Sequence, residues 1–157
     1  MGDWAELLID PRPIRAIFGE TAPSLDQVEL LEIVLDVNSG PDAILRFDLA
    51  EFPSLPPKKW RDDGCNTVQV RLRAVSVQAL EIRGLLISPI LDLKILRDGE
   101  LLRVQAATGG ISIDIASEFL DVGSDSVSAY VNDRRGDGRA PRLGDTFPCA
   151  RITTLTA

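Results

Sequence analysis

Apolar and polar residues alternate along most of this chain, starting near residue 28. A period of two is typical of a β-strand that buries one face and exposes the other. Clusters of Gly, Pro, Asn and Asp separate several of the alternating segments, as expected for turns. The pattern therefore predicts about eight strands. They fall at residues 31–37, 45–49, 68–72, 80–82, 91–95, 102–104, 111–115 and 127–131.

The first 20 residues follow a helical pattern instead. Asp3 is placed to cap a short helix, and Ile14, Ile17 and Phe18 recur at the spacing of one helix face. Gly19 suits the left-handed position that ends a helix. We therefore expect one or two short N-terminal helices ahead of the sheet.

Local signals indicate how some of these segments connect. A dense turn signal at residues 38–42 predicts that residues 29–50 form a hairpin, and Asp98-Gly99 predicts a second hairpin. The segment 52–60 contains three prolines and ends in Trp60. Because proline has no N–H group, we expect this segment to lie extended over the sheet or along its edge.

These elements predict a mainly β, α+β fold. About eight mostly antiparallel strands would form a curved sheet, a sandwich or a partly open barrel. A chain of 157 residues with 45% apolar residues is long enough for one domain with its own core. Residues 133–157 are rich in Arg, Gly, Asp and Pro and lack an apolar period. We expect a single domain over residues 1–132 and a flexible tail over 133–157.

The charge is distributed unevenly. Residues 1–133 hold 22 acidic and 12 basic side chains, a net charge of −10, whereas residues 134–157 carry a net charge of +3. An acidic domain argues against nucleic acid as its ligand, since phosphate contacts need a basic face. It is compatible with steering toward a basic protein partner, and simple solubility is the alternative explanation. No apolar run is long enough to cross a bilayer and the N-terminus lacks a secretory signal, so we expect a cytoplasmic protein.

The chain is poorly equipped for catalysis. It has no histidine, the usual general base and commonest metal ligand, and no phosphate-binding loop. Cys65 and Cys149 are too few for a disulfide framework or a zinc site, and we expect free thiols. We therefore expect no enzyme, no cofactor and no metal. A carboxylate-dependent hydrolase remains an alternative, although the adjacent pair Asp62-Asp63 beside Gly64 is also typical of a turn.

A few residues are candidates for contact with a partner protein. Trp4 and Trp60 can act as partner anchors, or they can cover the ends of the β core. Asp62 and Asp63 follow Trp60 in an expected exposed turn. We predict Trp60, Asp62 and Asp63 as partner-binding residues. A different alternative is a small-molecule carrier, since eight strands can close into a barrel around a ligand.

An ordered set of short motifs between Trp4 and Tyr130 resembles a bacterial polymorphic-toxin immunity protein family, immunity protein family fifty. Its sharpest piece is Pro56-Pro57-Lys58-Lys59-Trp60. The other pieces are Trp4 with Leu7-Leu8, Ile17-Phe18-Gly19, Pro23-Ser24-Leu25, Val28-Glu29-Leu30, residues 45–49, Phe52-Pro53, residues 66–72, Val77, Leu80, Gly84 and Val127–Tyr130. The tail after Asn132 matches no part of the family pattern.

The resemblance implies a non-enzymatic protein that binds and neutralises a cognate toxin in stoichiometric fashion. The family supplies no catalytic residues to carry over, and its matched positions are mainly prolines, aromatics and inward apolar residues. Contacts with the toxin are therefore expected on loops, which can vary without disturbing the core. Whether the protein is a monomer or a homodimer stays open.

Overall fold

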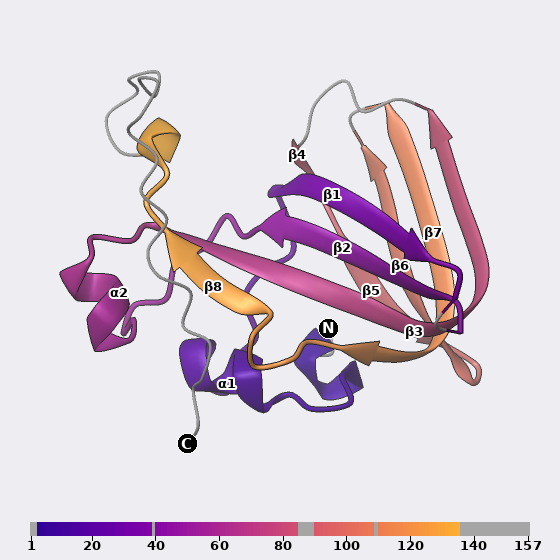
Figure 1. Ribbon diagram of the computed structural model, residues 1–157, viewed down its shortest axis with the longest axis horizontal. Helices are drawn as coiled ribbons and strands as arrows, with labels where there is room; N and C mark the ends of the chain where they lie inside the picture. The colour runs from indigo at the N-terminus through magenta and orange to yellow at the C-terminus, as the bar shows by residue number, and fades with distance from the viewer. Residues whose placement is uncertain (1–2, 39, 85–89, 109, 136–157) are drawn as a thin grey trace.

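The computed structural model describes residues 3–38, 40–84, 90–108 and 110–135, and these form a single antiparallel sheet with short helices (Figure 1). The strand order is β4-β1-β2-β3-β7-β6-β5, and β8 pairs with β3 off this path. The strands are β1 (Val28–Asp36), β2 (Asp42–Asp48), β3 (Thr67–Gly84), β4 (Ile90–Leu91), β5 (Lys94–Asp98), β6 (Leu101–Thr108), β7 (Ile111–Asp121) and β8 (Val127–Tyr130). The expected mainly β fold of about eight antiparallel strands is confirmed.

The sheet curves without closing. β1, β2 and the first part of β3 cross in front of β5, β6 and β7 (Figure 1). The end strands β4 and β5 do not pair with each other, so the sheet is not a closed barrel. The space between the two parts of the sheet is filled by one hydrophobic core, whose largest fully buried side chains include Trp60, Phe47, Leu45 and Leu72.

β3 joins the two parts of the sheet. Its first part pairs with β2 and β8, and its second part pairs with β7. Where the strand passes from one part to the other, Ser76 has a positive φ of 56° and the register shifts between Val77 and Ala79. The prediction of two strands, at 68–72 and 80–82, is wrong, because a bulge lets one strand of 18 residues bend without ending.

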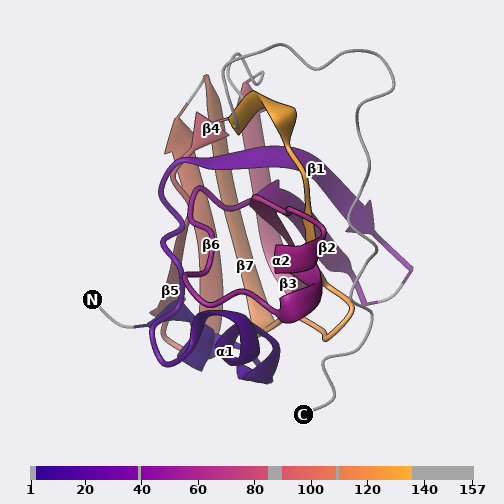
Figure 2. The same ribbon diagram turned by 90° about the vertical axis from the view of Figure 1, so that its left-hand side faces the viewer.

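The N-terminal helices form as expected. They are the 3₁₀-helix η1 (Trp4–Leu7) and the α-helix α1 (Arg12–Phe18), which lie together at one end of the sheet (Figure 2). The Asp3 carboxylate accepts a hydrogen bond from the Ala5 amide at 3.0 Å and so caps η1. Gly19 ends α1 with a positive φ of 78°.

The proline-rich segment 52–60 differs from its prediction at its end. Instead of remaining extended, the chain enters the short helix α2 (Lys58–Asp62) directly after Pro57. Proline fixes φ near the value that precedes a helix, and the turn buries Trp60 completely. A second short 3₁₀-helix, η2 (Asp133–Arg135), follows β8. It begins the predicted tail, and residues 136–157 of that tail lie outside the described residues.

Two further predictions need correction. Cys65 is disulfide-bonded, so the expectation of a free thiol is wrong there, while Cys149 lies outside the described residues. The alternation of residues 45–49 places Asp48 on the outward phase of its strand and so predicts a solvated carboxylate, but Asp48 is fully buried. Its carboxylate is covered because Gln69 and Tyr130 donate hydrogen bonds to it from the neighbouring strands.

Candidate functional site

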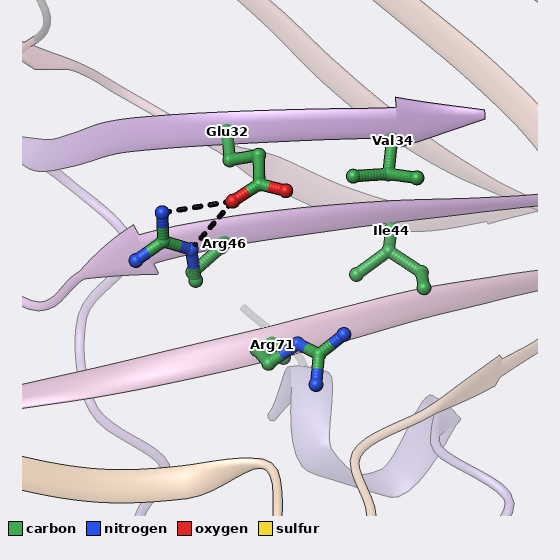
Figure 3. A pocket seen from close by; sticks show the side chains of 5 residues that line it. All are labelled: Glu32, Val34, Ile44, Arg46 and Arg71. Atoms are coloured by element: carbon green, nitrogen blue, oxygen red, sulfur yellow. Dashed lines mark hydrogen bonds and ion pairs between the residues drawn. The ribbon is translucent and has the colours of Figure 1, made fainter.

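The outward side chains of β1, β2 and β3 form an exposed surface of mixed character (Figure 3). Glu32 and Val34 of β1, Ile44 and Arg46 of β2, and Arg71 of β3 line a depression of about 400 Å³. We call these five residues the outer face. On the opposite side of the same strands, alternate residues are buried in the core, so the outer face rests on a fixed apolar layer.

Strand register sets the neighbours on the outer face. Arg46 lies directly opposite Glu32 on one side and directly opposite Arg71 on the other. Val34 lies opposite Ile44, whose other neighbour is Arg73. Residues that face each other across antiparallel strands have Cβ atoms about 5 Å apart, so these pairs are direct neighbours.

A hydrogen-bonded network spans four strands at one end of the outer face. The Arg46 guanidinium donates to the Glu32 carboxylate at 3.0 Å and to the side-chain oxygen Oε1 of Gln69 at 3.3 Å. The side-chain nitrogen Nε2 of Gln69 donates to the Asp48 carboxylate at 3.2 Å, and the Tyr130 hydroxyl donates to the other Asp48 oxygen. The network satisfies the buried Asp48 carboxylate, which would otherwise be costly to bury.

A second ion pair lies beyond the other end of the outer face. The Arg73 Nε donates to Asp42 Oδ2 at 2.9 Å, and the Ser76 amide donates to Asp42 Oδ1 at 3.2 Å. The Asp42 side chain is only 2% exposed, whereas Arg73 is 47% exposed. Asp42 therefore ties β2 to the point where β3 bends.

Arg71 lies between these two hydrogen-bonded networks, but its side chain takes part in neither. It is exposed, and its guanidinium makes no hydrogen bond or ion pair among the residues that the structure describes. Figure 3 shows the guanidinium beside Ile44, while the dashed contacts join only Arg46 and Glu32. Its backbone is fixed, because the Arg71 amide donates to the Ser126 carbonyl at 2.9 Å. Arg71 thus presents five free donors from a rigid strand.

Tyr130 makes this network sensitive to alkali. Burial, followed by the hydrogen bond to Asp48 and its charge, raises the pKa of Tyr130 above the usual value near 10. The folded protein therefore holds the phenol proton more tightly than the unfolded chain does. The Tyr130 contribution to stability is complete below pH 10 and is lost as the pH rises further, with a limit of about 1.4 kcal/mol per pH unit.

We expect the free energy of unfolding to fall by about 1 kcal/mol between pH 9 and pH 11, less than the limit because Tyr130 is half-buried and solvent screens it. Urea denaturation at both pH values measures this change. The matched variant is Tyr130→Phe, which should lose about 1 kcal/mol at pH 9 and then show a smaller alkaline decline. Equal declines in the two proteins would contradict the assignment.

The residues predicted for partner binding lie elsewhere: Trp60 and Asp62 belong to α2, and Asp63 directly follows it as the C-cap. Trp60 is fully buried and packs near Phe52, with the ring centroids 6.3 Å apart, so it is a core residue. Asp62 and Asp63 are exposed, as expected for residues available to a partner. Their contact with a partner stays a prediction.

Sequence reasoning did not single out Arg71 or its neighbours. The alternation at 68–72 places Arg71 on the outward phase of its strand, which is ordinary for a charged residue. What distinguishes it is the register that sets it against Arg46 and leaves it without a carboxylate. Strand pairing over such a distance has no local signal in a single sequence.

Two observations concern other classes of site. Among the described residues, no group of three or more potential ligand residues is placed to hold a metal ion. None of the described helices is long and apolar enough to cross a membrane.

Comparison with known proteins bears on the resemblance seen in the sequence. Residues 10–127 match the family described as Immunity protein 50, a span that contains α1 and strands β1 to β7. No curated protein and no solved structure matches the chain. Since the matched span covers most of the chain, the resemblance is confirmed, and the protein belongs to the immunity protein 50 family.

Proposed function

We propose that the protein binds a cognate bacterial toxin and neutralises it by forming a stoichiometric complex. The observation that carries this proposal is the family match over residues 10–127. The fold suits such a role, because a continuous sheet over one filled core presents fixed outward side chains to a partner. The mechanism is steric: the bound protein covers the toxin's active site or an adjacent surface.

We place this activity in the cytoplasm and assign no catalytic step to the protein. The net charge of −10 over residues 1–133 favours a toxin with a basic surface, since opposite charges accelerate encounter. Such steering acts mainly on the association rate and weakens with salt. The complex would therefore form fastest at low ionic strength.

Co-expression with the toxin encoded by the neighbouring gene tests the proposal. Cells that produce both proteins should survive, and the purified proteins should form a complex at micromolar concentration or below. The control expresses the toxin with an unrelated acidic protein of similar size. Unchanged killing together with no complex at micromolar concentration would refute the proposed function.

Asp62 and Asp63 form a separate part of the proposal. We expect Asp62→Lys/Asp63→Lys to lower the association rate by about tenfold at low salt, because both charges lie on an exposed surface. Stopped-flow association or surface plasmon resonance measures the rate. Glu81→Lys/Glu118→Lys changes the total charge equally at exposed positions on β3 and β7. If both double variants slow association equally, α2 makes no specific contact.

A further inference from the structure

We propose that Arg71 is the anchor of a docking surface formed by the outer face, and that it binds an aspartate or glutamate carboxylate on the partner protein. The partner surface around this carboxylate would be apolar. This inference rests on the proposed function, because it takes the cognate toxin as the partner.

Arg71 occupies an electrostatically unfavourable position within the fold. Arg71 lies directly opposite Arg46 on the neighbouring strand, and like charges in that position repel. A glutamate or glutamine at position 71 would face Arg46 favourably. An arrangement that costs stability without a local benefit is typical of a functional site.

The arginines on either side of Arg71 have carboxylate partners, whereas Arg71 has none among the described residues. Arg46 is paired with Glu32, and Arg73 is paired with Asp42. Glu32 and Asp42, the carboxylates that reach the neighbours of Arg71, are therefore already paired. Asp121 and Asp125 line a depression that Arg71 also borders, but among the described residues no ion pair joins either of them to Arg71. We therefore expect a partner protein to supply the carboxylate that pairs with Arg71.

Apolar side chains border Arg71 on the outer face. Val34 is 38% exposed, and Ile44 lies between Val34 and Arg73 in the strand register. A partner that covers these side chains would exclude water around the guanidinium, which strengthens a charge-assisted hydrogen bond. Together with Trp and Tyr, arginine is the residue type most often found at the energetic centre of an interface.

The acidic side chains near Arg71 also argue against a polyanionic partner. Arg71 borders a second depression of about 310 Å³, which is lined by Asp36, Asp42, Asp121 and Asp125. Four acidic side chains near the anchor would repel a polyanion such as a nucleic acid. A single carboxylate is repelled far less than a polyanion, and bidentate pairing with Arg71 can offset that smaller repulsion.

Titration calorimetry with the purified cognate toxin tests the anchor. We expect Arg71→Ala to weaken binding about 30-fold, the effect of an interface hot spot. Arg71→Lys should lose about tenfold, because an ammonium group cannot form the paired hydrogen bonds of a guanidinium. Arg71→Glu should lose at least 100-fold.

The matched control is Arg97→Glu. Arg97 is an exposed arginine on β5 that makes no ion pair among the described residues, so its reversal changes the total charge by the same amount. We expect its affinity to stay within about threefold of the wild type. Equal losses for Arg71→Glu and Arg97→Glu would show a general charge effect and overturn the anchor.

Thermal unfolding separates lost binding from lost folding. Arg71→Glu should have an unchanged or higher melting temperature, because the new carboxylate faces Arg46. If Arg71→Glu fails to fold, the affinity of Arg71→Gln for the toxin is compared with that of the Arg97→Glu control instead. A reversed variant of the toxin, with its contacting acid changed to lysine, should restore binding to Arg71→Glu but not to the wild type.

The outcomes distinguish the two proposals. A wild-type protein that fails to bind or neutralise the toxin refutes the proposed function and the anchor with it. A wild-type protein that neutralises the toxin while Arg71→Glu binds equally well overturns the anchor alone.

Discussion

Replacing Trp60 by alanine should lower the free energy of unfolding by about 3–5 kcal/mol, the usual cost of deleting a large buried aromatic side chain. The Trp60 side chain is 0% exposed, although it lies on the short helix α2 rather than on the sheet. It is the largest of the fully buried side chains and belongs to the single core cluster. Removing it leaves a cavity that five helical residues cannot fill by moving inward.

Trp60→Phe is the informative companion. The indole Nε1 is buried and has no hydrogen-bond partner among the described residues, so it contributes an unmet polar group to the core. Phenylalanine removes this group and part of the volume, and we expect a loss of only about 1–2 kcal/mol. Urea denaturation followed by far-ultraviolet circular dichroism measures both variants. Equal losses for phenylalanine and alanine would show that the indole N–H contributes to stability.

Strands with one buried face were the most predictable part of this fold. The hairpin over residues 29–50, the pair around Asp98-Gly99 and the strand at 111–115 all appear where alternation and turn residues place them. Both signals are local, because alternation reports which face is buried and the turn reports where the chain reverses.

Features that depend on distant contacts were not predictable in this way. The helix α2 is five residues long, too short for a helical period, and it is held by the burial of Trp60. At the bend in β3 the Ser76 amide donates a hydrogen bond to Asp42, which lies 34 residues earlier in the chain. The outer face depends on registers between β1, β2 and β3. A single sequence gives the outward phase of Arg71 but neither its neighbours nor its missing counter-charge.

The pair formed by Asp42 and Arg73 should be the second large contributor to stability. We expect Arg73→Met to lower the free energy of unfolding by about 2–3 kcal/mol, because it leaves the Asp42 charge buried with the Ser76 amide as its remaining hydrogen-bond donor among the described residues. The loss is smaller than for a fully enclosed pair, since Arg73 is half-exposed and water can partly replace it. Chemical denaturation at neutral pH measures this loss.

A matched exposed pair provides the control. Arg83 and Glu81 also form an ion pair on β3, but both side chains are more than half exposed. Arg83→Met should therefore cost less than about 1 kcal/mol. A loss for Arg73→Met no greater than this would show that burial of Asp42 carries no special penalty.

A double-mutant cycle shows whether the effect belongs to the pair. Asp42→Ala removes the buried charge together with its hydrogen bond to Ser76. In the Asp42→Ala background, Arg73→Met should therefore cost much less than it does in the wild type, with a coupling of about 1–2 kcal/mol.

Because Ser76 has a positive φ and donates to Asp42, loosening this carboxylate should also loosen the bend of β3. Amide exchange at Ser76 and Val77 should accelerate in Arg73→Met, while exchange at Val70 stays slow. Additive losses with unchanged exchange would mean that the bend is held by β7 pairing instead, and that Arg71 keeps its position without help from Asp42.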